Sequence, residues 1–561
     1  MKKILILSLL TSAALLAAQS PINTGDILRQ VEPILIPQTP KALPSVGAGE
    51  FKAPLKVKDD MKILIKSFTL SGNSVFSNET LFELIKSYEN KELGINGLKE
   101  VTSIITKYYR DNGYFVARAY LPAQTLENGI VEINIIEGNY GAFEINNSSL
   151  VKTAEVQEYM QYLNEREKIS TKSLERQMLL INDLSGAVVT NAELYPGKEV
   201  GTSDFRITVE PTPKYSAYAV VDNYGSRYLG ENRLSAGAFI NSLSNVGDTL
   251  SFSSLFSHTG NLKNGRIAYD RPLGYSGLIG GVSFSITDYK LEKIPSYDVF
   301  GRADTYNAYV SYPFIKTRDH TLSLDLSYDH KEMKDSSGAT GNEIDKSHKK
   351  IDALSLKLND KKNTTLLNLP GILFTSIGFT LGDLDLANSV AVKNDDNLES
   401  EGIYSKAVLS VNHTQVLNSF LNLQTNFKAQ KSFNKNLDSS EDISVGGSNG
   451  VRAYEDSELS GDKGYALSLD LIYKLPSMAQ INHNTSVFVD HARVWTNENI
   501  FNDEDNIRTL NALGLGYSLN YKTFDLKATY AHGFGRDATP ASEAEFSTSK
   551  NKFLIQGIMR F

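Results

Sequence analysis

The sequence contains no cysteine, which excludes disulfide scaffolds, thiol nucleophiles and cysteine-bound zinc or iron–sulfur centres. This absence also suits a chain that crosses an oxidising compartment, where free thiols would mispair. Nucleic-acid binding is disfavoured, because 57 Lys and Arg face 65 Asp and Glu, a net charge of −8. Only 16 of the 561 residues are proline and 41% are hydrophobic, so the chain is neither collagen-like nor disordered.

Long apolar runs are also missing beyond the N-terminus. Residues 1–18 begin with two lysines, continue with an apolar stretch from Ile4 to Leu16 and end in small residues. This pattern is typical of a secretory signal peptide, with cleavage near Ala18. A membrane anchor is the alternative, but it needs roughly 20 apolar residues and Gln19 ends this run too early. Since no later stretch is long enough, a mature chain that spans a membrane must do so as a closed barrel.

The next segment combines a short helical pattern with a stretch rich in proline. Residues 19–33 contain a predicted helix that starts at Thr24. Residues 34–60 contain prolines at positions 37, 40, 44 and 54, which interrupt regular structure, so this stretch is predicted to be a flexible linker. A disordered N-terminal tail is the alternative for the whole segment.

Residues 61–212 show one α/β arrangement twice. In residues 61–138 a strand near Phe68 is followed by two helices and two strands, and the second helix carries apolar side chains at three-to-four-residue spacing. Residues 139–212 repeat the order strand, helix, helix, strand, strand, with little sequence identity between the copies. The sequence therefore predicts two consecutive small α+β domains.

From residue 213 to residue 561, apolar and polar side chains alternate. Such alternation in segments of about ten residues is typical of an outer-membrane barrel, with apolar side chains toward lipid and polar ones toward the lumen. Connections are mostly short after even-numbered strands and long after later odd-numbered ones, the longest being a predicted extracellular loop at 434–461. This asymmetry favours a 16-stranded antiparallel transmembrane β-barrel over a soluble β-sandwich. The strands are predicted to begin near residues 214, 232, 247, 264, 276, 303, 318, 347, 370, 402, 418, 462, 482, 507, 523 and 550.

No constellation of catalytic or metal-binding residues stands out in the sequence. The eight histidines lack the spacing of metal ligands, and the glycine-rich stretch 446–450 is not followed by the Lys-Ser/Thr of a phosphate loop. No Gly-x-Ser-x-Gly motif occurs, although a Ser-His-Asp triad is defined by geometry and stays open. We therefore expect no cofactor, no metal and no enzymatic activity.

Several motifs together point to a known family. They are Gly113–Pro122 with Ile136-Glu137-Gly138, then Leu194-Tyr195-Pro196-Gly197, and finally Asp222-Asn223-Tyr224-Gly225 with Gly230 and Arg233. They resemble the ends of the two polypeptide-transport-associated (POTRA) domains and the first barrel hairpin of two-partner secretion transporters, the haemolysin secretion/activation type within the outer-membrane assembly superfamily. The resemblance implies that residues 61–138 are POTRA 1 and residues 139–212 POTRA 2. It also implies that residues 19–33 form a plug helix in the pore.

The same resemblance implies a functional site. Val451-Arg452-Ala453-Tyr454, in the long loop, is similar to the family's loop-6 motif of valine, arginine, glycine and tyrosine. Phe488, Asp490 and Ala492 resemble its partner motif on the barrel wall. By this resemblance Arg452 pairs with Asp490 in the lumen, which agrees with a strand register that turns Val487 and Val489 toward lipid. Ala453 and Ala492 stand where the family usually has glycine.

The function that the resemblance implies is export of one large, extended exoprotein, which carries an N-terminal secretion domain. The expected location is the bacterial outer membrane, with POTRA domains in the periplasm that bind the unfolded partner at sites the sequence does not identify. We also expect contact with outer-membrane lipid, insertion by the barrel assembly machinery, and function as a monomer without nucleic acid. An assembly factor that inserts other barrels is the main alternative, ahead of a diffusion porin and an outer-membrane hydrolase.

Overall fold

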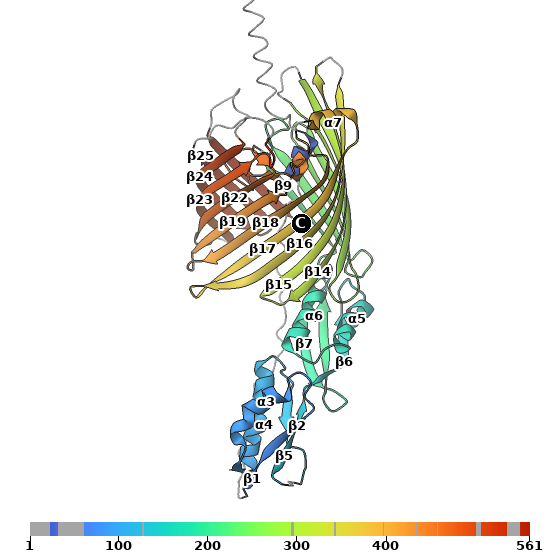
Figure 1. The fold of residues 1–561 in the computed structure, drawn as a ribbon, viewed down its shortest axis with the longest axis vertical. Helices are drawn as coiled ribbons and strands as arrows, with labels where there is room; N and C mark the ends of the chain where they lie inside the picture. Colours follow the sequence, from blue (N-terminus) through green and yellow to red (C-terminus); the bar gives the residue numbers. More distant parts are fainter. Residues whose placement is uncertain are drawn as a thin grey trace, which may run out of the picture.

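Two small α/β domains are joined to a closed β-barrel (Figure 1). The computed structural model describes residues 23–31, 61–125, 128–292, 297–340, 344–396, 398–433, 435–456, 458–478, 480–500, 506–535 and 550–561. The predicted signal peptide and the whole of the predicted linker therefore lie outside the described residues.

The first domain contains a three-stranded sheet in the order β2-β5-β4, covered by two helices. Strands β2 and β5 are parallel, whereas β4 and β5 are antiparallel. A separate pair, β1 and β3, was not predicted as such, because β3 has only three residues and two of them are charged. The elements are β1 (Ile63–Ile65), β2 (Ser67–Ser71), α3 (Asn78–Ile85), η1 (Lys86–Tyr88), β3 (Lys91–Leu93), α4 (Ile95–Asp111), β4 (Arg118–Tyr120) and β5 (Ile130–Ile136).

The second domain repeats this plan with a sheet in the order β6-β8-β7, in which β6 and β8 are parallel. Ser170 caps α6 by accepting a hydrogen bond from the N–H of Ser173, and α5 and α6 bury their apolar faces against the sheet. The elements are β6 (Asn139–Asn147), α5 (Thr153–Asn164), α6 (Thr171–Asp183), β7 (Val188–Pro196) and β8 (Thr202–Glu210).

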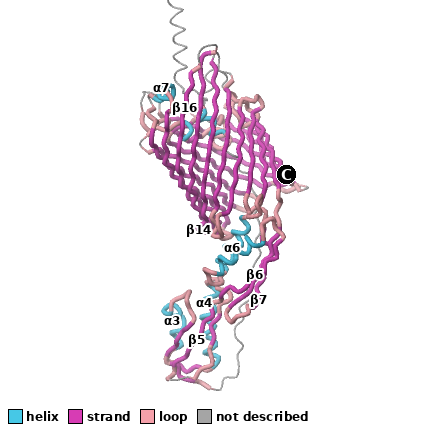
Figure 2. Tube along the Cα trace, turned by 90° about the vertical axis from the view of Figure 1, so that its right-hand side faces the viewer, coloured by secondary structure: helices cyan, strands magenta, loops and turns pink. Residues whose placement is uncertain are grey.

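Helix α6 attaches the second domain to the barrel. Arg176 donates to the carbonyl oxygen of Pro313 at 2.8 Å and to that of Ser276 at 3.2 Å. Lys316 pairs with Asp183 at 2.7 Å, just before the turn between two barrel strands. The domain is therefore fixed against short turns at one end of the barrel, and the other α/β domain lies further out (Figure 2).

The barrel is a closed sheet of sixteen antiparallel strands, as predicted. Strand β9 closes it against β26 through five paired positions, from Tyr218–Arg560 to Asp222–Gln556. The strands are β9 (Tyr215–Asp222), β10 (Arg233–Asn241), β11 (Thr249–Ser257), β12 (Leu262–Pro272), β13 (Ile279–Lys290), β14 (Tyr297–Lys316), β15 (His320–Ala339), β16 (Asp345–Leu366), β17 (Leu369–Leu386), β18 (Gly402–Val416), β19 (Leu421–Ser432), β22 (Lys463–Lys474), β23 (Ile481–Trp495), β24 (Ile507–Tyr521), β25 (Phe524–Gly533) and β26 (Asn551–Arg560).

Four neighbouring strands are longer than a membrane requires. A transmembrane strand needs about 9–11 residues, but β14, β15, β16 and β17 have 20, 20, 22 and 18. They rise on the side away from the α/β domains, where helix α7 (Ser389–Asp395) connects β17 to β18 (Figure 1). Sequence reasoning assigned parts of these segments to loops, because their outer ends are polar on both faces.

Candidate functional site

The long loop between β19 and β22 turns into the barrel. It contains a turn of 3-10 helix, η2 (Ser439–Glu441), and a two-residue strand pair, β20 (Ile443–Ser444) and β21 (Ser460–Gly461). Its apolar residues Val451 and Tyr454 are buried together with wall residues of β23 to β25. The loop therefore fills part of the lumen.

Arg452, in this loop, binds Asp490 on strand β23. Its Nε donates to Oδ2 of Asp490 at 2.9 Å, and its Nη2 donates to Oδ1 at 2.6 Å. The backbone N–H of Arg452 also donates to Oδ2 at 3.0 Å. Asp490 is only 1% exposed, so the contact predicted from the sequence is present as a buried, bidentate ion pair.

Asp470, on strand β22, is a second carboxylate partner that sequence reasoning missed. Arg452 Nη1 donates to one of its oxygens at 2.8 Å and Nη2 to the other at 3.1 Å. Asp470 lies directly opposite Phe488 in the strand register, so it faces the lumen. An isolated acid between Leu469 and Leu471 in an alternating strand is the signal that could have identified it. We call Arg452, Asp470 and Asp490 the Arg452 cluster.

Phe488 completes the surroundings of Arg452. The guanidinium lies 3.4 Å from the centre of the Phe488 ring, a cation–π contact. A Cβ at Gly514, on the next strand, would lie 2.8 Å from Cε1 of Phe488, so this glycine makes room for the ring. The predicted register is correct: Phe488 is 5% exposed, whereas Val487 and Val489 are 51% and 43% exposed.

The remaining motif residues also lie at this site. Ala453 and Ala492 are buried, and neither is among the described residues with positive φ, so alanine in place of glycine causes no backbone strain there. Tyr454 packs against Gly533, where a Cβ would lie 3.0 Å from the tyrosine oxygen. All the motif residues predicted from the sequence are thus brought together.

A second set of ion pairs holds the loop at η2. The carboxylate of Glu441 binds Lys331 at 2.6 Å and Lys406 at 2.9 Å, and Asp438 binds Lys349 at 2.8 Å. Both acids are buried. No sequence motif marked these pairs, because their partners come from strands about 30 to 110 residues away.

Helix α2 (Thr24–Gln30) lies inside the barrel, at the end away from the α/β domains (Figure 1). Ile27 is fully buried in a cluster with wall residues such as Leu255 and Tyr289. At its start, the N–H of Thr24 donates to Asp335 on β15 at 2.8 Å, and Ser439 of η2 donates to Asn23 at 2.6 Å. The helix therefore occupies the lumen and contacts both the wall and the loop.

Arg233, in the first-hairpin motif, connects the wall to this helix. It donates to Asp222 on β9 at 2.8 Å and to the carbonyl oxygen of Gln30 at 3.4 Å. It also lies 3.8 Å from Asp456 of the loop. One buried guanidinium thus contacts the barrel wall, helix α2 and the loop.

Glu137 is the central polar group of the first α/β domain. It accepts hydrogen bonds from the N–H groups of Ser74 and Val75 at 2.7 and 2.8 Å and from the Tyr109 hydroxyl at 2.8 Å. Burial by itself would raise the pKa of Glu137, but these bonds, with one from the Ser74 hydroxyl, hold the pKa below its ordinary value. Burial, and then the same contact with Glu137, raise the pKa of the Tyr109 hydroxyl.

The family model of the haemolysin secretion/activation protein ShlB/FhaC/HecB matches residues 201–550, and that of the ShlB-type POTRA domain matches residues 63–138. The chain belongs to the ShlB/FhaC/HecB family. It is a two-partner secretion transporter of the outer membrane, with periplasmic POTRA domains and a secreted partner protein. The α/β domains described above are POTRA 1 and POTRA 2, the latter beside the periplasmic end of the barrel.

Curated relatives agree with this family, and a solved structure agrees with the fold. The heme/hemopexin transporter protein HuxB of Haemophilus influenzae Rd is 28% identical over 495 residues, 86% of each chain, and the outer membrane transporter CdiB of Dickeya dadantii is 22% identical over 78% of each. CdiB from Escherichia coli has a TM-score of 0.74 at 19% identity, covering 92% of this chain and 93% of that one.

No described helix is long and apolar enough to cross a membrane. Within the same part of the chain, no three His, Asp or Glu side chains are grouped to hold a metal ion.

Proposed function

We propose that the chain carries one large exoprotein, unfolded and extended, from the periplasm through the barrel lumen to the cell surface. The observation that carries this proposal is the arrangement of the lumen. It is obstructed by α2 and by the loop, both of which are held inside the barrel by noncovalent polar and apolar contacts. The obstruction can therefore leave while the barrel stays closed.

POTRA 1 and POTRA 2 would bind the partner before it enters the barrel. In the described part of the chain, β2 and β4 are the edges of one sheet and β6 and β7 of the other. An edge strand offers unpaired backbone groups, to which an extended segment of the partner can add as a further strand. POTRA 2, attached through Arg176, would deliver that segment beside the periplasmic opening.

The Arg452 cluster and α2 would act as the gate. In the resting state α2 plugs the lumen, and the bidentate contact of Arg452 with Asp490 keeps the loop folded inward. The description of the family as haemolysin secretion/activation proteins favours a haemolysin-like partner that is activated by secretion, with an adhesin as the alternative. We further propose that the chain works as a monomer without enzymatic activity, that the assembly machinery inserts it, and that folding at the cell surface drives export.

The test compares proteins released from or exposed on source cells with and without this gene, alongside their outer-membrane barrel content. Loss of one large protein with other barrels unchanged is expected, and it would identify the partner. A broad fall in many barrels would instead support the assembly factor and overturn the proposal.

A further inference from the structure

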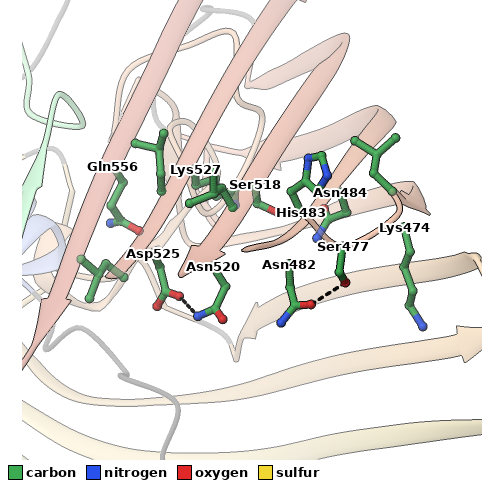
Figure 3. A pocket seen from close by; sticks show the side chains of 14 residues that line it. Lys474, Ser477, Asn482, His483, Asn484, Ser518, Asn520, Asp525, Lys527 and Gln556 are labelled. Carbon is green, nitrogen blue, oxygen red and sulfur yellow. Dashed lines mark hydrogen bonds between the residues drawn. The ribbon is translucent and has the colours of Figure 1, made fainter. Parts of the chain in front are cut away.

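A hollow of about 530 Å³ opens in the inner wall of the barrel, formed by β22 to β26 (Figure 3). It lies at the periplasmic end, beside the turns that join β22 to β23 and β24 to β25. Its size is within the range of roughly 300–1,000 Å³ usual for ligand sites. Its lining includes Asn482, Asn484, Ser518, Asn520, Lys527 and Gln556.

The strand register directs these side chains into the lumen. Asn482 and Asn484 precede Phe488 by even numbers of residues on β23, so they share its face. Their cross-strand partners are Asn520 and Ser518, and Lys527 is paired with Gln556. The hollow thus lies on the same wall as the Arg452 cluster, between that cluster and the periplasmic opening.

The lining is rich in neutral groups that both donate and accept hydrogen bonds. Asn484 accepts from Ser518 at 2.7 Å and Asn482 accepts from Ser477 at 2.8 Å, so these bonds use the carbonyl oxygens and leave the amino groups available (Figure 3). Asp525 is paired with Arg560. Two lysines, Lys474 and Lys527, also line the hollow, and Lys527 lies within electrostatic reach of Arg452 as well as of Asp470 and Asp490.

We propose that this hollow binds the backbone groups of an extended segment of the exported polypeptide while that polypeptide passes through the barrel. This inference rests on the proposed function. Side-chain amides match the free N–H and C=O groups of an extended chain whatever its sequence. The polar lining comes mainly from the four strands β23 to β26, which at about 4.8 Å apart span about 14 Å, the length of about four extended residues at about 3.4 Å each. Neutral hydrogen bonds are individually weak, so a segment can enter and also move on.

The test measures binding of a fluorescent 16-residue probe peptide, a repeat of Ser-Asn-Gly-Thr, to the purified full chain by anisotropy. The triple variant Asn482→Leu, Asn484→Leu, Asn520→Leu is expected to weaken binding at least tenfold, about 1.4 kcal/mol. The corresponding triple alanine variant serves if the leucines disturb the barrel. Asn426→Leu is the matched control, since Asn426 pairs with Ser468 on the lumen face outside the hollow.

A probe with N-methyl groups on alternate residues should also bind at least tenfold more weakly, whereas probes with added Glu or Lys should bind within twofold of the neutral one. Unchanged binding by both triple variants, or affinity that follows peptide charge, would overturn the proposal. A further test places one cysteine at position 484 and another within residues 34–60. If the two form a disulfide and the wild-type chain binds no probe, the chain's own linker is the occupant, and the proposal is overturned. If cells that lack this gene still export all of their surface and released proteins, that result would instead contradict the proposed function.

Discussion

Gly25 of helix α2 lies so close to η2 that a Cβ on it would be 2.5 Å from the backbone nitrogen of Ser440. The plug helix therefore rests directly on the backbone of the loop, which Glu441 anchors to the wall one residue later. This contact makes the position of α2 depend on the position of the loop. We therefore expect α2 and the loop to move together when either leaves its resting position.

Gly25→Leu should dislodge α2, because no rotamer of leucine avoids the backbone of Ser440. We expect the ion conductance of the full chain in planar lipid bilayers to rise severalfold while the barrel still folds. Gln30→Leu is the control, since the contact between Arg233 and Gln30 uses only the backbone carbonyl. Conductance that stays at the wild-type level in Gly25→Leu would contradict the contact.

Arg452→Ala should release the inner part of the loop, because it leaves Asp470 and Asp490 buried without their guanidinium. Removing one partner of a buried ion pair costs about 3–5 kcal/mol. We expect increased cleavage of the loop by protease added to intact cells, and a large fall in export at normal barrel levels. Arg452→Lys keeps the charge but loses the bidentate geometry, so its export should be little better than that of Arg452→Ala. Undiminished export in Arg452→Ala would exclude the proposed role.

Glu441→Gln should lower the stability of the folded chain more than removing Glu441 together with the two lysines that bind it. The single change leaves Lys331 and Lys406 facing each other without a counter-charge, at a cost of about 3–5 kcal/mol. Adding Lys331→Met and Lys406→Met should recover part of that loss, because no buried charge then remains unpaired. Thermal unfolding of Glu441→Gln, of the double variant Lys331→Met with Lys406→Met, and of the triple variant measures the difference, and additive losses would refute the pairing.

POTRA 1 should lose stability in acid through Glu137. The folded-state pKa of this carboxyl lies below its ordinary value of 4.5, so its contribution is fully present above about pH 4.5 and is lost as the pH falls through the lowered pKa. Urea unfolding followed by helical circular dichroism should show this loss in the wild type. Glu137→Gln should be less stable by about 1–3 kcal/mol at neutral pH, without that acid dependence. An identical acid response in the variant would contradict the assignment.

The sequence predicted most of the barrel because alternation and turn residues are local signals. Predicted strand starts such as 402 and 507 coincide with β18 and β24. Strand β16 continues to Leu366, and Leu367 and Asn368, both with positive φ, make a tight turn to β17, whose start at Leu369 agrees with the predicted start near 370. Helix α7 was missed, since its seven residues are too few to show a helical periodicity.

The site was predictable only in part. Arg452 and Asp490 were identified through motifs, but Asp470 and the lysines that bind Glu441 were not, because their proximity depends on how the barrel closes. The placement of α2 against Gly301 and Asp335 likewise depends on the shape of the lumen. Pairings such as Lys331 with Glu441 and Thr24 with Asp335, which are 110 and 311 residues apart, are a property of the closed sheet and not of any local pattern.

The central claim, that the partner passes through the lumen that α2 occupies, is tested most directly by locking α2 to the wall. Thr24 and Asp335 are in side-chain contact, and the chain has no other cysteine, so Thr24→Cys with Asp335→Cys can form one defined disulfide. We predict that export stops when this bond forms and resumes on reduction, while either single variant exports normally. Export that continues with the disulfide intact would contradict the account.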